Sequence, residues 1–348
     1  MEKRKAHKQE LINALTEAQK LAFAPLSFHA IAAMIEFGIL KEIDTKPKSL
    51  EELIQKSDYS EYTITTLLEV SELIGIVKQK EGIFNITSMG RAFLYDEMTR
   101  VNFNFVKDVC YSGASELANS FKSSSPKGFQ QLKQDAKTIY PYLSELPTKM
   151  RKSWYEFDHY YSDNCFDIIF EILDTDKKIF DIGGNTGKFE KVCLKKNPNI
   201  DITMLDLPKN IDVVKEDEEL LGCKFIATDI LDEESPIPQF SGSVIMSQFL
   251  DCFSKSQIEY ILRRVAKNSD FGTKIYILEP FIDRQKFEGA KHSLVHTSLY
   301  FTCMANGCSK MYSMNEMKEI IERAGLKVNQ VYDALGAHDY TLLECVHA

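Results

Sequence analysis

Apolar positions in the second half of the chain fall into short runs of the kind that form buried strands. Six such runs predict strands at residues 178–182, 201–208, 223–230, 243–250, 274–279 and 340–346. The segments between them have helical character, and Ser254 is placed to cap one of these helices. Alternating strands and helices predict a parallel, doubly wound sheet whose ligand lies at the carboxyl edge of the strands.

The first half of the chain is helical in pattern, beginning with an unusually apolar stretch at residues 21–40. Pro25, His29, Glu36 and Gly38 interrupt this stretch, whereas a membrane span needs ~20 uninterrupted apolar residues. We therefore expect no membrane partner here. The stretch is better explained as a helix buried on most sides, as happens where two subunits interlock.

A winged-helix pattern follows. The sequence S-L-E-E-L from Ser49 has the Ser and Glu spacing of a capping box, residues 64–73 have helical spacing, and Glu81-Gly82 separates two short strand-like runs. Such a domain raises the possibility of a DNA-binding regulator. The recognition helix of a regulator is basic, but residues 60–75 contain three glutamates and neither Lys nor Arg. Together with a net charge of −9, this predicts no nucleic-acid partner.

Length and composition are those of an ordinary soluble protein. The 348 residues predict two domains, with 44% hydrophobic and 27% charged residues. Eight cysteines occur without a C-x-x-C pair, which is typical of reduced thiols in a cytoplasmic protein. Metal binding by Cys303 and Cys308 is an alternative, but we expect no metal. The first ten residues lack the apolar core of a signal peptide.

The most informative segment, residues 178–191, combines a strand, a glycine-rich turn and a helix start. Gly183, Gly184 and Gly187 permit positive φ and a close approach of the backbone to a ligand, which the N-terminus of the following helix would also contact. Asp181 precedes the turn, in the spacing D-x-G-x-N-x-G rather than G-x-G-x-x-G. A carboxylate there would repel a pyrophosphate but tolerate a sulfonium such as S-adenosylmethionine. An NAD-dependent oxidoreductase remains the alternative.

Two further acids stand at the ends of the next predicted strands. Asp206 is placed to accept both hydroxyls of a ribose, and Asp229 to accept the amino group of an adenine. Either acid alone is more typical of a turn or a helix cap. Together with the glycine turn they indicate a nucleoside site.

The blocks D-I-G-G-N-T-G, L-D-L-P and A-T-D-I resemble the motifs of class I S-adenosylmethionine-dependent O-methyltransferases with an N-terminal dimerisation domain. The resemblance implies an α/β, Rossmann-like domain with a mostly parallel seven-stranded sheet, its last strand antiparallel. It also implies a winged-helix dimerisation domain at residues 1–98, a helical connector at 99–175, and the methyltransferase domain at 176–348. A cytoplasmic homodimer and a small, aromatic hydroxyl acceptor follow from it.

The resemblance also implies the site residues. Those expected to bind the cofactor are Asp181, Gly183, Gly184, Asn185, Asp206, Leu207, Asp229, Ile230, Ser247 and Gln248. Those expected to bind the acceptor are Trp154, His159, Tyr160, Phe249, Cys252, His292 and Tyr300. Asn185 replaces the family's middle glycine, a mild departure because Asn tolerates a left-handed conformation.

The catalytic segment departs further from the family. The family reads approximately L-H-D-W-S-D, with His as general base, whereas residues 250–255 read L-D-C-F-S-K. Asp251 in the His position is a base, a substrate-orienting acceptor or a structural cap, and Glu279 beside it could share its proton. His292 and His296 lie one helical turn apart, so His296 is a second candidate base, and a metal pair is the alternative. A binding protein that lost catalysis with the His also remains possible.

Overall fold

The computed structural model describes residues 2–348, with side chains from residue 7 onward. The chain forms two compact units, one ending at Phe103 and the other comprising Asn104–Ala348. Residues 104–175 therefore belong to the same unit as the large sheet. Each unit is described by itself.

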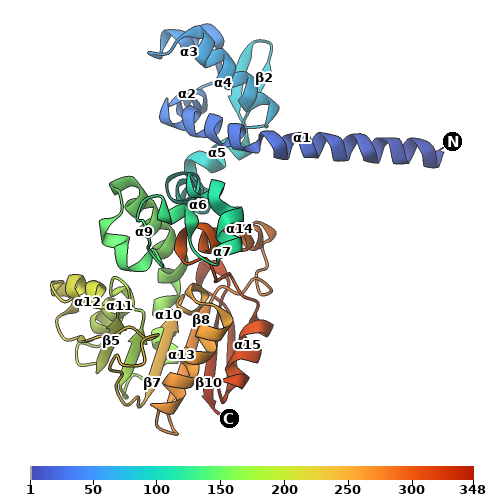
Figure 1. Ribbon diagram of the computed structural model, residues 1–348. Coiled ribbons are helices and arrows are strands. Elements are labelled where there is room, and N and C mark those ends of the chain that lie inside the picture. The colour runs from blue at the N-terminus through green and yellow to red at the C-terminus, as the bar shows by residue number, and fades with distance from the viewer. Residues whose placement is uncertain (1) are drawn as a thin grey trace. The chain divides into compact units, whose positions relative to one another are not determined.

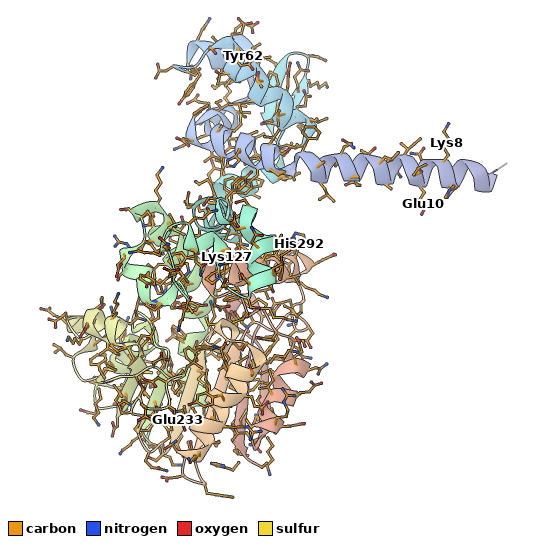
Figure 2. All side chains as sticks on the ribbon, viewed as in Figure 1. Lys8, Glu10, Tyr62, Lys127, Glu233 and His292 are labelled. Atoms are coloured by element: carbon orange, nitrogen blue, oxygen red, sulfur yellow. The ribbon has the colours of Figure 1, made fainter. Side chains whose placement is uncertain are left out.

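The first unit begins with a long helix, α1 (Glu2–Glu36), which ends where Gly38 adopts a φ of 72°. In the stretch 21–40, where burial was expected, Ile31 is the first buried residue, and Leu21, Phe23 and Leu26 are exposed in the single chain. Figure 2 shows the side chains of α1, with Lys8 and Glu10 labelled near its start. Among the described helices, the segment His7–Glu36 has the length and apolar composition of a membrane span, although Pro25 lies inside it.

The remainder of this unit is a small helical domain with a three-stranded sheet in the order β1-β3-β2. Its elements are α2 (Ile39–Thr45), β1 (Lys48–Ser49), α3 (Leu50–Gln55), α4 (Glu61–Leu73), β2 (Val77–Lys80), β3 (Ile83–Ile86) and α5 (Ser88–Tyr95). Ser49 and Glu52 form the expected capping box at the start of α3. The hairpin is also confirmed, because β2 and β3 pair antiparallel across Glu81 and Gly82, both of which have positive φ.

The second unit contains a seven-stranded sheet in the order β6-β5-β4-β7-β8-β10-β9, which confirms the expected fold class (Figure 1). The strands are β4 (Ile179–Ile182), β5 (Ile202–Asp206), β6 (Lys224–Ala227), β7 (Ser243–Ser247), β8 (Lys274–Glu279), β9 (Leu326–Leu335) and β10 (Tyr340–His347). Strands β4 to β8 are parallel, and β10 runs antiparallel to β8 and to β9. Strand β9 had no counterpart among the predicted strands.

The helices of the unit are α7 (Leu117–Ser123), α8 (Lys127–Gln130), α9 (Thr148–Ser162), α10 (Phe166–Ile172), α11 (Lys188–Lys196), α12 (Pro208–Val214), α13 (Lys255–Lys267), α14 (Glu288–Tyr300) and α15 (Met314–Arg323), while α6 (Glu97–Phe105) contains the boundary between the units. Helices α11, α12, α13 and α15 pack against strands of the sheet. One core joins strand residues such as Val244 and Ile277 to Ile261 of α13 and Ile320 of α15. As expected, Ser254 caps α13.

The strand order reverses between β4 and β7, which lie side by side although residues 183–242 separate them in the sequence. The loop after β4 therefore turns toward one side of the sheet and the loop after β7 toward the other. A reversal of this kind opens a crevice at the carboxyl ends of the strands, where α/β proteins bind their ligands.

Candidate active site

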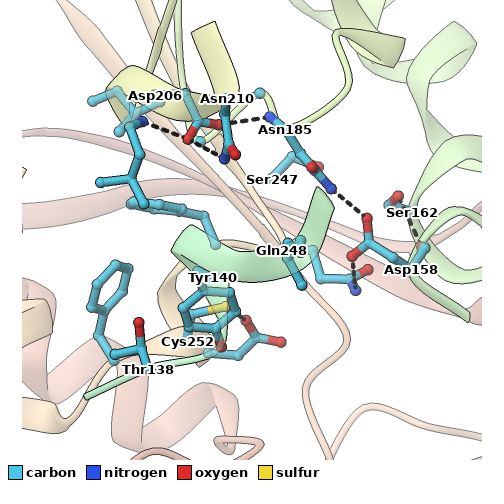
Figure 3. Close-up of a pocket in the computed structure, with 18 of the residues that line it drawn as sticks. Thr138, Tyr140, Asp158, Ser162, Asn185, Asp206, Asn210, Ser247, Gln248 and Cys252 are labelled. Atoms are coloured by element: carbon cyan, nitrogen blue, oxygen red, sulfur yellow. Dashed lines mark hydrogen bonds between the residues drawn. The ribbon is translucent and has the colours of Figure 1, made fainter. Parts of the chain in front are cut away.

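A cavity of about 530 Å³ occupies this crevice in the second unit. The loops that follow β4, β5, β6 and β7 form one side of it, and residues of α9 and α14 form the other. Figure 3 shows part of its lining, with Asp206, Asn185 and Asp158 along one wall and Tyr140 and Cys252 on another. All ten residues expected to bind the cofactor line this cavity.

The glycine turn requires glycine at its first position. Gly183 has a φ of +86°, and a Cβ atom there would lie 2.2 Å from the Cδ2 atom of Phe249. Asn185, the departure from the family pattern, adopts a left-handed φ of 52°. Gly187, with a φ of 72°, begins α11. The turn thus brings backbone close to the cavity, as a bound nucleoside requires.

Asp206 is anchored to the glycine turn. The backbone N–H of Asn185 donates to Oδ2 of Asp206 at 2.8 Å, and both the backbone N–H of Leu207 and the amide of Asn210 donate to Oδ1, at 2.6 and 2.8 Å. Burial raises the pKa of Asp206, and these three donors oppose that rise. A carboxylate fixed in this way presents its remaining acceptor positions to the cavity.

Asp181 is paired with a carboxyl group that the sequence did not single out. Glu190 of α11 is fully buried, and neither of its carboxyl oxygens has a hydrogen-bond partner among the described residues. Burial raises the pKa of Asp181 to about 7 and that of Glu190 well above its usual range, and the Asp181 charge raises the latter further. Burial thus favours the neutral form of both carboxyls, so at neutral pH the pair carries less than its full negative charge.

The other end of the cavity is lined by aromatic residues and one buried acid. The indole N–H of Trp154 donates to the hydroxyl of Tyr300 at 2.7 Å, and Phe249 packs edge to face against Phe253. Asp251 is 3% exposed and its only described side-chain donor is the thiol of Cys252, at 3.4 Å from Oδ1. Burial raises the pKa of Asp251 to about 7, and the charge of nearby Asp158 adds to the rise.

Glu279 lies beside this group without lining the cavity. Its Oε1 atom accepts the backbone N–H groups of Phe249, Leu250 and Asp251 at 3.2, 2.9 and 3.3 Å. Burial raises the pKa of Glu279 well above the usual range, and the charge of Asp251 raises it further. Glu279 thus fixes the turn that carries Asp251.

Besides Glu279, three of the residues assigned from the resemblance lie outside the cavity. Tyr160 packs its ring on His338, with centroids 4.3 Å apart. His292, labelled in Figure 2, and His296 are exposed on α14, with ring centroids 4.1 Å apart. Tyr300 of the same helix lines the cavity as expected, and so does Thr297, which was not predicted. No group of three or more potential metal ligands occurs in the part of the chain that the structure describes.

His159 and two residues that sequence reasoning left out complete the lining. His159 lies against the glycine turn, with Nε2 3.4 Å from the hydroxyl of Thr186. Asp158 contacts Asn185 and Gln248, and Tyr140 has a buried hydroxyl without a hydrogen-bond partner among the described residues. Asp158 lies in the aromatic run at residues 154–163, but only the fold shows that its carboxyl reaches the glycine turn.

The cavity has the features that a cationic nucleoside cofactor requires. Its walls combine a glycine turn with no room for a Cβ atom at Gly183, the anchored carboxylate of Asp206, which is placed to bind a ribose, and further acids. The two lysines in the lining, Lys137 and Lys188, are exposed. This donor set suits a sulfonium better than a pyrophosphate.

Residues 165–327 match the family model of the O-methyltransferase domain, and residues 16–84 match that of the Dimerisation2-like domain. The chain thus contains an O-methyltransferase domain preceded by a Dimerisation2-like domain. Demethylspheroidene O-methyltransferase of Rhodobacter capsulatus is 22% identical over 85% of this chain and 72% of its own. Bacteriochlorophyllide d C-20 methyltransferase of Chlorobaculum tepidum is 23% identical over 91% and 94%.

Solved structures share the fold of this O-methyltransferase. Mitomycin 7-O-methyltransferase MmcR superposes with a TM-score of 0.73 over 98% of this chain and all of its own, at 17% identity. The O-methyltransferase NcsB1, solved in complex with S-adenosylmethionine and 2-hydroxy-5-methyl naphthoic acid, gives 0.67 over 92% and 96%, at 16% identity. The expected family and fold are therefore confirmed.

Proposed function

We propose that this O-methyltransferase transfers a methyl group from S-adenosylmethionine to a hydroxyl of a small aromatic acceptor, with Asp251 as the general base. The observation that carries the proposal is the continuity of one cavity from the glycine turn and Asp206 to the buried Asp251 carboxyl. A methyl donor held at the first end and an acceptor held at the second would share one enclosed space. Alignment of the reacting atoms accounts for much of the rate of such a displacement.

The residues of the chain divide the work along the cavity. Asp206 would bind the ribose of the cofactor and Asp229 would bind its adenine. The backbone of the turn at Gly183–Asn185 would contact the cofactor directly. When bound, the cofactor supplies an electrophilic methyl group. Trp154, Phe249 and Tyr300 would pack on a flat acceptor and exclude water.

Asp251 is suited to accept the proton of the acceptor hydroxyl. A free Asp, with a pKa of ~3.9, is too weak a base for a phenol. Burial raises the pKa of Asp251 to about 7, within the range in which a general base works near neutral pH. The thiol of Cys252 and the backbone anchor at Glu279 keep the carboxyl in one place.

An assay with a panel of phenolic acceptors tests whether the protein transfers a methyl group or only binds the cofactor. Purified protein incubated with S-adenosylmethionine and a series of phenols should yield a methylated product and S-adenosylhomocysteine, both measured by mass spectrometry. Binding of S-adenosylhomocysteine without turnover on any acceptor would favour a binding protein with this fold. Binding of NAD in its place would overturn the proposal. Product analysis should locate the methyl group, since one relative is named for a carbon position.

We also propose that the protein is a homodimer through its first unit. The Dimerisation2-like domain at residues 16–84 supports this assignment. So do the exposed apolar side chains of α1, which no other described part of the chain covers. A cytoplasmic location is the corresponding expectation for a biosynthetic enzyme of this kind.

A further inference from the structure

Asp158 of α9 is a partly buried acid that has no role in the reaction outlined above. Its carboxyl lines the cavity and is held from two loops at once. The side-chain amide of Asn185 donates to Oδ2 at 2.9 Å, and that of Gln248 to Oδ1 at 3.4 Å. Asp158 therefore joins the loop after β4 to the loop after β7, on either side of the point where the strand order reverses.

A line of hydrogen bonds fixes where Asp158 lies along the cavity. Asn185 bonds to Asp206 through its backbone N–H and to Asp158 through its side chain. At the other end, the charge of Asp158 raises the pKa of Asp251. Figure 3 shows Asp206, Asn185, Asp158 and Gln248 in this succession. Asp158 thus stands between the ribose end of the site and the base, where the sulfonium must be for its methyl group to reach an acceptor.

The surroundings leave the charge of Asp158 largely uncompensated. Its two described donors are neutral amides, and the neighbouring charges are those of His159, Asp163 and Asp251. The lysines of the cavity lining, Lys137 and Lys188, are exposed. Asp181 is less suited to a ligand cation because it lies beside the buried carboxyl of Glu190 and burial raises its pKa to about 7, which favours its neutral form. A carboxylate whose direct donors are neutral amides and that keeps spare acceptor positions is a site for a ligand cation.

We propose that Asp158 is the counter-ion of the sulfonium and makes this enzyme bind its charged methyl donor more tightly than the neutral sulfide that remains after transfer. The inference rests on the proposed function, because it requires S-adenosylmethionine in the cavity. It has a functional consequence: loss of the positive charge removes the attraction to Asp158 and so favours product release.

Binding alone tests the assignment. Isothermal titration of the full chain at pH 7.5 with S-adenosylmethionine, and separately with S-adenosylhomocysteine, gives the ratio of the two affinities. Asp158→Asn, which keeps the size of the side chain, should lower this ratio by about tenfold, as expected for a desolvated charge contact. The matched control is Glu156→Gln, which removes an exposed carboxylate from the same helix, where it pairs with Lys152. The control should leave the ratio unchanged.

Each other outcome overturns the inference. An equal loss of affinity for both ligands would place Asp158 at the amino group, which both ligands carry. Unchanged affinities would make Asp158 a purely structural link between the loops. Thermal melting without ligand shows whether Asp158→Asn still folds. If it does not fold, Asp158→Glu and the salt dependence of the wild-type affinity ratio test the same contact.

Failure of the wild-type protein to bind either ligand would instead contradict the proposed function.

Discussion

Glu279 holds Asp251 through its backbone, since Oε1 of Glu279 accepts the backbone N–H of Asp251 at 3.3 Å. The same oxygen accepts the N–H groups of Phe249 and Leu250, so one carboxyl organises the entire turn after β7. The Asp251 side chain is thereby free to face the cavity, while Glu279 lies outside it. In the proposed reaction, Glu279 would act by positioning Asp251.

Replacement of Asp251 by Asn should lower turnover about 10²- to 10⁴-fold, the usual cost of losing a general base. Asn preserves the size of the side chain, and the backbone anchor at Glu279 is unaffected. Affinity for S-adenosylhomocysteine should therefore change little. Steady-state kinetics with an acceptor found in the panel, together with calorimetry, measure the two effects.

His292 and His296 provide the control for this substitution. Both are exposed on α14 and outside the cavity, so His292→Gln and His296→Gln should retain turnover. Asp251→His should restore part of the activity, because imidazole is the base at this position in the family. Near-normal turnover in Asp251→Asn combined with inactivity in either His variant would move the base to α14.

The rate should rise with pH through the pKa of Asp251, which burial raises to about 7. Below this pH the carboxyl is protonated and accepts no proton from the acceptor. The other titratable groups that interact with it are Asp158, Glu279, Cys252, Tyr140, Tyr312 and Tyr340. The pH profile of kcat/KM for the wild-type enzyme should therefore show a rise near pH 7, and this rise should be absent in Asp251→Asn. If the rise persists in the variant, the titrating group is one of those neighbours.

The same shift makes a prediction about stability. The pKa of Asp251 is higher in the folded protein than its unfolded value of ~3.9, so its contribution is fully present below that value and is lost as pH rises through about 7. Asp251→Asn removes the buried charge and should be more stable than wild type at pH 8, by up to ~4 kcal/mol for a shift of about three units. Urea unfolding at pH 5 and pH 8 measures the difference, which should be smaller at pH 5.

The cofactor half of the site could be predicted from the sequence because its residues are local to strand ends. The turn at Gly183–Asn185, Asp206 and Asp229 each follow a buried strand, and the carboxyl ends of parallel strands meet at one edge. The fold class followed from the same alternation. Strand β9 was not predicted because its alternate residues are largely solvated and its apolar signal is weak.

The acceptor half was predicted only in part, because it depends on which face of a helix lies toward the cavity. On α14 the sequence indicated Tyr300, which lines the cavity, but also His292 and His296, which are exposed. On α9 it indicated Trp154 and His159, which line the cavity, but also Tyr160, which does not, and it missed Asp158. A buried acid such as Glu190 gives no signal in the sequence either, since glutamate in the first turn of a helix is ordinary.

Asp206→Ala should weaken the binding of S-adenosylhomocysteine by about tenfold or more, because it removes a buried carboxylate placed for two ribose hydroxyls. It also removes the acceptor for the N–H of Asn185, which loosens the glycine turn. The control is Asp212→Ala on α12, whose carboxylate is exposed and pairs with Lys215. If calorimetry gives equal affinities for the two variants, Asp206 does not bind the ribose.

Gly183→Ala should abolish cofactor binding. Its Cβ atom would overlap the ring of Phe249, and a φ of +86° is strained for alanine. Gly272→Ala is the control, because a Cβ atom there meets nothing within 4 Å. Titration with S-adenosylhomocysteine should show binding in the control alone. Normal binding by Gly183→Ala would mean that the cofactor does not use this turn.

The dimer should depend on one stripe of α1. Leu11, Leu15 and Leu26 are exposed, and spacings of 4 and 11 residues place them on one face of a helix. Leu15→Ser with Leu26→Ser should convert a dimer to a monomer in multi-angle light scattering, because the apolar surface that drives association is lost. Leu73→Ser, on the exposed face of α4 in the same unit, is the matched control and should remain dimeric. A wild-type protein that is monomeric at micromolar concentration and sediments with lipid vesicles would assign the stripe to a membrane surface instead.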